Sequence, residues 1–289
     1  MKGISKNDRG YLKIFLFILL FAILSGCNGT NPVIHSFFAG PSTIVAGDSA
    51  TLSWTVTDAD SVTIDYGIGT VALTGITTVN PTTDTTYTLI ATNSAGPVTA
   101  TVTVTVAPIE TLTLQPGSEG KDAFVNSDDF YPDTNSEDSV YLFAGNNGFI
   151  NRTYIQFDLN PNPLPAGAVI TDARLKLYQD VILITGSFNG GLYTVTSNWE
   201  ENEITWNNQP TSSSDIVSLP VLYDTTGTWV TCHIEDFVKG WLDGSITNYG
   251  LLLKATNELS EDSGARFLSS DYVTDMTKRP ILEIDYYVP

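Results

Sequence analysis

The stretch 199-WEENEITWNNQP-210 decides the fold of the larger part of this 289-residue chain, and we call it the tryptophan stretch. Its two indoles, Trp199 and Trp206, enclose a short acidic run, and the polar sequence NNQP that follows favours a turn. An indole buries a large apolar area and needs a partner for its N–H group. Each ring is therefore expected to anchor the edge of a core.

The segments around the tryptophan stretch alternate apolar and polar residues, as strands do. Residues 173–178 (ARLKLY) place apolar side chains at every second position. A helical segment is predicted at residues 233–242, where Phe237 and Trp241 lie four positions apart on one face. Several strands and one short helix predict a jelly-roll-like β-sandwich for residues 110–289.

Five segments of this region occur in the order and spacing of a known family. They are DAFV at 122–125, RTYIQFDL at 152–159, LPAGAVITDARLKLY at 164–178, the tryptophan stretch at 199–210 and NYGLLL at 248–253. Together they resemble the DNRLRE-type domain, also described as carbohydrate-binding module family 96, over about residues 110–289. That family is seen in bacterial and archaeal surface proteins and in some polysaccharide lyases. The resemblance implies a β-sandwich that binds polysaccharide.

Residues 34–107 form a separate block of short alternating segments. Residues 50–56 alternate apolar side chains with Thr and Ser, and NSAG at 93–96 is typical of a hairpin turn. The block resembles the immunoglobulin-like domains repeated in bacterial surface proteins. The whole chain is therefore predicted to be all-β, with an N-terminal immunoglobulin-like sandwich followed by the larger jelly-roll-like sandwich. Residues 27–120 contain no Lys or Arg, which favours a spacer over an adhesive module as the role of the block.

The N-terminus carries the pattern of an export signal. A basic segment precedes the apolar residues 14–24, which are too few to span a bilayer, and the sequence LSGC that ends at Cys27 resembles the lipobox of bacterial lipoproteins. We therefore predict a lipoprotein signal peptide at residues 1–26, acylation of Cys27 and a lipidated tether at residues 27–33. The chain would then be held in a lipid bilayer at the outer membrane or cell surface, facing outward. An ordinary signal peptide with an incidental cysteine is the alternative.

The chain is strongly acidic, with a formal net charge of −19. Removal of residues 1–26 would leave 9 basic and 31 acidic residues, a formal charge of −22. Such a surface repels phosphates, which excludes nucleic acid as a partner. The acidity itself is explained by the solubility of an exported β protein.

The acidic loop at residues 128–138, DDFYPDTNSED, holds five carboxylates and one asparagine. Calcium takes roughly six to eight oxygen ligands, which such a loop could collect, although the spacing does not match an EF-hand. The alternative is a solvated loop without an ion. The candidate calcium ligands are Asp128, Asp129, Asp133 and Asp138.

The sequence lacks the residue sets on which common enzyme mechanisms depend. Its two histidines, His35 and His233, fall in different predicted domains, which excludes triads and two-histidine metal sites. Glu200 and Glu201 would need a facing carboxylate that no motif supplies. Cys232 alternates with apolar neighbours and is interpreted as a core residue. We therefore predict that the protein is not an enzyme.

A sugar-binding surface needs aromatic rings for the apolar face of a pyranose, together with amides or cations for its hydroxyl and acid groups. The larger domain has these residue types, although each ring taken singly is as well explained by the core. We predict non-catalytic binding of an extracellular polysaccharide or envelope glycan. A structural or adhesive surface protein is the alternative, and an accessory part of a polysaccharide-degrading system is the third reading. The candidate glycan-binding residues are Tyr178, Trp199, Trp206, Asn207, Arg152 and Arg174.

Overall fold

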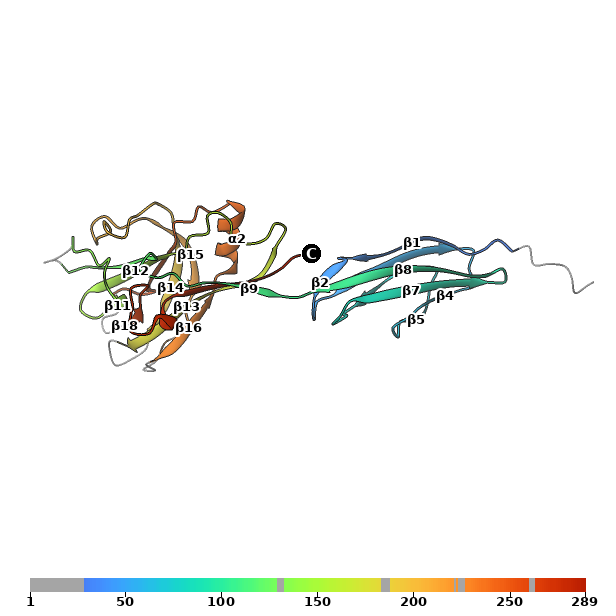
Figure 1. Cartoon of the computed structure of the whole chain (residues 1–289), viewed down its shortest axis with the longest axis horizontal. Helices are drawn as coiled ribbons and strands as arrows, with labels where there is room; N and C mark the ends of the chain where they lie inside the picture. The colour runs from blue at the N-terminus through green and yellow to red at the C-terminus, as the bar shows by residue number, and fades with distance from the viewer. Residues whose placement is uncertain (1–28, 129–132, 183–187, 221, 223–226, 260–262) are drawn as a thin grey trace, which may run out of the picture. The chain divides into compact units, whose positions relative to one another are not determined.

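The computed structural model describes residues 29–128, 133–182, 188–220, 222, 227–259 and 263–289. The chain divides into two compact units, Met1–Pro108 and Ile109–Pro289, each with a core of its own (Figure 1). Regular structure in the described residues is almost entirely strand. The prediction of an all-β chain with a short helix in its larger part is confirmed. No helix within these ranges is long and apolar enough to cross a bilayer.

The first unit is a sandwich of two sheets. One sheet has the order β1 (Val33–Gly40), β3 (Ala50–Thr57), β6 (Thr74–Val79), and the other has the order β2 (Thr43–Val45), β8 (Gly96–Ala107), β7 (Thr85–Asn93), β4 (Ser61–Ile64), β5 (Gly69–Val71). This order is typical of immunoglobulin-like sandwiches. Trp54 is buried between the sheets, and its indole N–H donates to the carbonyl of Ala72 at 2.8 Å.

The hairpin predicted from NSAG joins β7 to β8. Asn93 pairs with Gly96, and the side-chain oxygen of Asn93 accepts the backbone N–H of Ala95 at 2.8 Å. Gly96 has a φ of 126°, a conformation that side chains disfavour, so a glycine is needed there. Tyr87 and Leu89 point into the core from β7, as the alternation of the sequence requires.

The second unit is built on one hydrogen-bonded sheet whose two halves pack on a shared core as a sandwich. The fourteen-residue strand β13 pairs with β19 over residues 169–176, with β16 over residues 174–179 and with β18 over residues 179–182, where the register shifts. The strand order is β15-β14-β17-β12-β11-β18-β13-β19-β9, with β10 beside β12 and β16 beside β13. The strands are β9 (Glu110–Leu114), β10 (Lys121–Asn126), β11 (Tyr141–Asn146), β12 (Ile150–Gln156), β13 (Val169–Ile182), β14 (Gly190–Val195), β15 (Ser212–Ser218), β16 (Thr228–His233), β17 (Leu251–Ala255), β18 (Ser263–Leu268) and β19 (Ile281–Tyr287).

The main core of this unit lies between the two halves of the sheet, and the helix α2 (Glu235–Asp243) closes one end of it. Phe237 and Trp241 of α2 are buried in this core, as their spacing predicts, and Gly244 ends the helix with a φ of 80°. Cys232 is also buried there as a free thiol, and burial raises its pKa to about 12. It is therefore a core residue, as predicted. A short 3-10 turn, η1 (Met276–Lys278), precedes β19.

A second, smaller core lies on the other face of the strands β10, β12, β17 and β14. Leu251 and Leu253 point into the main core, whereas Leu252 points into this second one, which explains the unbroken apolar run. Trp199 is buried against Tyr154 with ring centroids 5.7 Å apart, and its indole N–H donates to the carbonyl of Tyr249 at 2.9 Å. The tryptophan stretch thus covers a sheet face that would otherwise meet water.

Candidate functional site

The tryptophan stretch forms two successive turns that its own side chains hold in place. The backbone N–H of Ile204 donates to the carbonyl of Glu200 at 2.9 Å. Asn208 then bridges the second turn, because its oxygen accepts the N–H of Thr205 at 2.7 Å and its amide donates to the carbonyl of Glu203 at 2.8 Å. The NNQP sequence therefore ends the stretch with a side-chain-to-backbone turn.

Arg152 fastens the end of this stretch to β12. Its guanidinium donates to both carboxylate oxygens of Glu258, at 2.6 and 2.7 Å, and to the side-chain oxygen of Gln209 at 2.8 Å. The same guanidinium lies 4.8 Å from the ring centre of half-buried Trp206. The hydroxyl of Tyr154 also donates to Gln209, at 3.0 Å. The hydrogen bonds to Glu258 raise the pKa of Arg152, which stays charged.

Asn207 connects the tryptophan stretch to the acidic loop. Its exposed amide donates to a carboxylate oxygen of Asp133 at 2.9 Å. Asn135 makes the same connection from the loop, because its amide donates to the carbonyls of Glu201 at 2.6 Å and Ile204 at 2.9 Å. The described end of the acidic loop is thus held against the turns of the tryptophan stretch.

Tyr178 and Arg174 lie on a different surface, the outer face of β13. The ring of Tyr178 meets that of Trp229 edge to face at 5.4 Å. The ammonium of Lys278 lies 4.8 Å from the Tyr178 ring, and that of Lys176 lies 5.6 Å from the Trp229 ring. Arg174 is paired with three carboxylates, those of Asp172 at 2.6 Å, Asp285 at 2.7 Å and Glu283 at 3.2 Å.

The six candidate glycan-binding residues therefore do not form one site. Arg152, Trp206 and Asn207 lie together at the tryptophan stretch, and Tyr178 and Arg174 lie on the outer face of β13. Trp199 is buried in the second core. Their role in sugar binding stays a prediction.

A groove of about 440 Å³ lies beside β10, and sequence reasoning did not find it. Its two aromatic rings are those of Phe124, which is half-buried, and of Phe149, which is 43% exposed. Such a volume and mixture of apolar and polar walls are typical of small-ligand sites. The remaining lining residues are polar: Asn126, Asp128, Thr134 and Ser136.

A row of rings continues from this groove across β11. Phe124 and Phe143 meet with their ring centres 4.8 Å apart, and Tyr141 follows at 6.4 Å from Phe143. The guanidinium of Arg266 lies 4.2 Å from the Tyr141 ring. The alternation in residues 139–144 could have revealed this row, because Leu142 enters the main core and its neighbours must face the other way.

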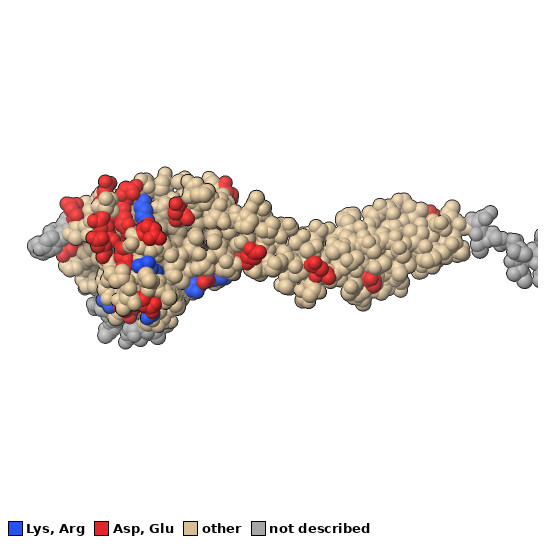
Figure 2. Space-filling view, viewed as in Figure 1, with Lys and Arg blue, Asp and Glu red and all other residues tan. Residues whose placement is uncertain are grey.

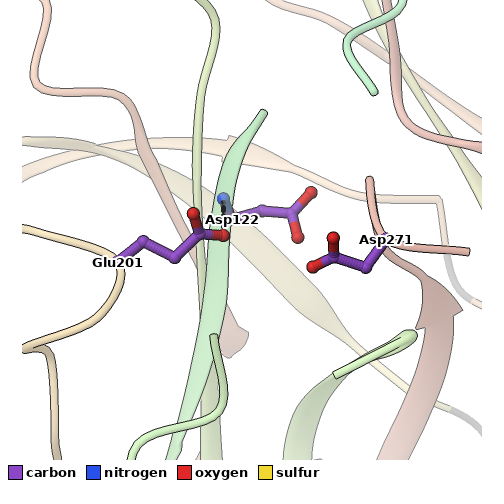
Figure 3. Close-up of side chains that lie close together, drawn as sticks. All are labelled: Asp122, Glu201 and Asp271. Carbon is purple, nitrogen blue, oxygen red and sulfur yellow. Dashed lines mark hydrogen bonds between the residues drawn. The ribbon is translucent and has the colours of Figure 1, made fainter. Parts of the chain in front are cut away.

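Three carboxylates converge at the other end of β10. Asp122, Glu201 and Asp271 each offer an oxygen within 4.8 Å of those of the other two. Figure 3 shows the carboxylates of Asp122 and Asp271 facing each other, with that of Glu201 beside the backbone of Asp122. Glu201 accepts the backbone N–H of Asp122 at 3.0 Å, and Asp122 accepts that of Ser270 at 2.9 Å.

This carboxylate cluster has unusual electrostatics. Burial raises the pKa of Asp122 to about 7. Burial also raises the pKa of Glu201 to about 7, with a contribution from the charge of Asp271. Burial and the nearby Asp138 raise the pKa of Asp271. Each shift reflects the cost of holding several negative charges away from water.

The candidate calcium ligands of the acidic loop that the structure describes are not among these three carboxylates. Asp133 is exposed and accepts the amide of Asn207, and Asp138 is exposed near Asp271. Asp128 lines the groove, and Asp129 lies outside the described residues. In the described ranges, Asp122, Glu201 and Asp271 are the one group of three or more acidic, histidine or cysteine side chains spaced to hold a metal ion.

Figure 2 shows acidic side chains gathered on the second unit around a few basic ones, whereas the first unit shows scattered acidic side chains and no basic ones on this face. The absence of Lys and Arg from residues 27–120 explains part of this contrast.

Comparison with known families identifies the second unit. The sequence profile of carbohydrate-binding module family 96 matches residues 110–285, which is more than half of the chain. The chain belongs to carbohydrate-binding module family 96. The resemblance carried by the tryptophan stretch and its neighbouring segments is thereby confirmed. The second unit is a carbohydrate-binding module, and we refer to it as the family 96 module.

Curated relatives match the chain at low identity. The tRNA3(Ser)-specific nuclease WapA of Bacillus spizizenii is 29% identical over 191 residues, and the tRNA nuclease WapA of Bacillus subtilis is 28% identical over the same length. Each match covers 60% of this chain and 7% of the relative. The chain thus spans a small part of these proteins, and the nuclease activity in their names describes the whole proteins.

Two solved structures align with much of the chain. SGBP-B of the Bacteroides ovatus mixed-linkage glucan utilization locus, in complex with a mixed-linkage heptasaccharide, is 15% identical to this chain. It aligns with 86% of this chain and 51% of that one, with a TM-score of 0.19. SGBP-B from a xyloglucan utilization locus of Bacteroides uniformis is 13% identical, with 89% and 72% coverage and the same TM-score. At this TM-score the alignments say nothing further about the family 96 module.

Proposed function

We propose that the family 96 module binds an extracellular polysaccharide or envelope glycan without catalysing its breakdown, and that the groove beside β10 takes the sugar chain. The family match over residues 110–285 is the observation that carries this function. The groove is a concave surface of the module in which two aromatic rings and several polar side chains meet.

The groove supplies the contacts that a sugar chain requires. Phe124 and Phe149 offer ring surface to the apolar face of a pyranose, and Phe143 and Tyr141 extend that surface across β11. Hydroxyl and amide groups along the wall can bind the sugar hydroxyls. The volume of about 440 Å³ is sufficient for a short segment of the chain and leaves the rest to run along the sheet.

The arrangement of the titratable groups favours binding over catalysis. His35 and His233 lie in different units. In the carboxylate cluster, Asp122 is 3% exposed, so a sugar cannot reach it as a general acid or base would have to. We therefore propose a module that binds its glycan and leaves it intact.

We further propose that the chain is an exported lipoprotein. Cys27 and the preceding signal lie outside the described residues, so the sequence LSGC and the apolar run before it support this proposal. An acylated Cys27 would anchor the chain in the lipid bilayer, residues 27–33 would form the tether, and the first unit would hold the module away from the membrane. Mass spectrometry of the mature chain from a bacterial host tests the anchor, and a Cys27→Ala chain that stays membrane-bound would contradict it.

A glycan array probed with the full chain tests the binding function. We expect binding to at least one polysaccharide, and a loss of about tenfold or more in affinity for Phe124→Ala and for Phe149→Ala, because a ring at the centre of an interface contributes about 2 kcal/mol. Tyr178→Ala is the matched control, since its ring lies on the outer face of β13.

Three results of this array would contradict the proposal. No binding to any glycan would favour a structural or adhesive surface protein. Loss of binding in Tyr178→Ala, with retention in the phenylalanine variants, would move the site to the face of β13. Cleavage of the bound glycan would favour a catalytic part in a polysaccharide-degrading system, whereas binding without cleavage is also what an accessory part of such a system requires.

A further inference from the structure

We propose that Asp122, Glu201 and Asp271, together with the hydroxyl of Ser270, form a divalent cation site of calcium size that fastens the tryptophan stretch to β10 and to the segment after β18. The site differs from the acidic loop at residues 128–138. The inference does not depend on glycan binding, and its test contains no glycan.

One buried oxygen of the Asp122 carboxylate lacks a hydrogen-bond partner among the described residues. Asp122 is 3% exposed, and its Oδ1 atom has no hydrogen-bond partner among the described residues, although its Oδ2 atom accepts the N–H of Ser270. The hydroxyl of Ser270 is likewise buried without a partner of good geometry in the part of the chain that the structure describes. Buried polar atoms are nearly always paired, so an unpaired carboxylate oxygen at this depth indicates a missing ligand. Figure 3 shows that the Asp122 carboxylate points into the cluster.

The spacing of the carboxylate oxygens suits a calcium ion. The three carboxylate oxygens lie within 4.8 Å of one another. Calcium binds oxygen at about 2.3–2.6 Å, so ligands on opposite sides of the ion are about 5 Å apart, whereas magnesium holds opposite ligands about 4 Å apart. All three oxygens are therefore within reach of a single calcium ion, which accepts irregular sets of oxygen ligands, whereas magnesium requires a near-ideal octahedron.

The cluster concentrates negative charge that a cation would offset. Three carboxylates share the cluster, and Glu137 and Asp138 add negative charge nearby. The basic groups close to them are Lys121, which is 3.7 Å from Glu200, and Arg279, which acts on Asp271. One divalent ion would offset most of the remaining charge and satisfy the buried oxygens together.

The position of the ligands gives the site a structural role. Asp122 belongs to β10, Glu201 to the tryptophan stretch, and Ser270 and Asp271 to the segment that follows β18. These three segments are far apart in the sequence. A bound ion would join them at a single point and hold the covering turns over the second core.

Calorimetric titration of the full, chelator-treated chain with calcium chloride tests the site, and magnesium chloride serves as the comparison ion. We expect one calcium bound by the family 96 module, weaker binding of magnesium, and a rise in melting temperature with calcium. Asp122→Asn and Asp271→Asn should each lower calcium affinity at least about tenfold, because each removes a charged ligand. Asp271 is half-buried in a loop, so its variant tests the site even if Asp122→Asn fails to fold.

Asp215→Asn is the matched control, because Asp215 is exposed on β15. Its affinity for calcium should equal that of the unchanged chain. The proposal is overturned by an unchanged chain that binds no calcium, and equally by an Asp271→Asn chain that binds it with full affinity. A loss of binding in Asp133→Asn with retention in Asp271→Asn would place the ion in the acidic loop and would also overturn it.

Discussion

The guanidinium of Arg152 and the carboxylate of Glu258 form a bidentate ion pair, with Nε–Oε1 and Nη2–Oε2 distances of 2.6 and 2.7 Å. Both side chains are largely shielded from water, with 23% and 17% of their surface exposed. Since Arg152 also donates to Gln209 and lies beside Trp206, the pair fixes the end of the tryptophan stretch to β12. The sequence nominated Arg152 for sugar binding, which stays a prediction, and the contacts of its guanidinium also make it a clamp within the protein.

We expect Glu258→Gln to lower the free energy of unfolding of the family 96 module by about 1–2 kcal/mol, because a shielded guanidinium loses its counter-charge. Urea unfolding followed by circular dichroism measures this. The control is Glu235→Gln in the exposed pair with Lys239 on α2, which should cost about 0–0.5 kcal/mol. Equal losses in the two variants would show that the Arg152 pair contributes no more than a surface pair.

The two tryptophans of the tryptophan stretch are expected to differ in their contribution to stability. Trp199→Ala should lower the free energy of unfolding by about 3–5 kcal/mol, because it empties a buried site and leaves the carbonyl of Tyr249 without its donor. Trp206→Ala should cost clearly less, since the ring is half-buried and loses mainly its contact with Arg152. Chemical unfolding followed by circular dichroism measures the loss in each variant. A loss in Trp206→Ala that equals or exceeds the loss in Trp199→Ala would contradict this description of the second core.

The Arg174 network predicts a loss of stability in acid. The hydrogen bond from Arg174 holds the pKa of Asp285 below its usual value. A carboxyl with a lowered pKa in the folded state contributes stability above its unfolded pKa of about 4, and this contribution is lost as the pH falls through the lower folded value. Asp285→Asn should therefore destabilise the protein by about 1–2 kcal/mol at pH 7 and by much less at pH 3.

Urea unfolding of the Asp285→Asn chain and of the unchanged chain between pH 3 and pH 7 measures that difference. The exposed Asp215→Asn variant controls for the change in net charge and should show no such trend. A destabilisation by Asp285→Asn that stays constant across this range would rule out the ion pair as its source.

The NYGLLL motif predicts a strict requirement for glycine. Gly250 has a φ of 85°, and a Cβ atom there would lie 2.4 Å from the carbonyl oxygen of Ile155. Gly250→Ala should therefore cost about 3 kcal/mol or more, from backbone strain and a clash with the neighbouring strand together. Gly148 has a φ of 106° with open space around its Cβ position, so Gly148→Ala should cost only about 1 kcal/mol. Thermal unfolding of both variants measures the two losses of stability. Similar losses would show that the contact with the Ile155 carbonyl adds nothing to the backbone strain.

The local features of the fold could be predicted from particular residues. The alternation in residues 173–178 predicts β13, the pair Phe237 and Trp241 predicts α2, and NSAG predicts the hairpin between β7 and β8. These predictions succeed because strand and helix periods and tight turns depend on neighbours a few positions apart.

The site could be predicted only in part. The sequence selected aromatic and basic residues by type, and the fold placed them on two surfaces and in the second core. Whether a ring such as Trp199 is a core anchor or a ligand platform depends on which sheet face the distant β12 and β17 present to it. No local pattern contains that information.

The sequence by itself determined that the chain is all-β, that its larger part belongs to carbohydrate-binding module family 96, and where most strands and the helix lie. The tertiary structure alone decided that Phe124 and Phe149 share a groove and that Asp122, Glu201 and Asp271 share a cluster. The physical reason is that each of these groups joins segments that are far apart in the chain. They meet only because β10 pairs with β12, β18 pairs with β11, and the tryptophan stretch packs over the second core.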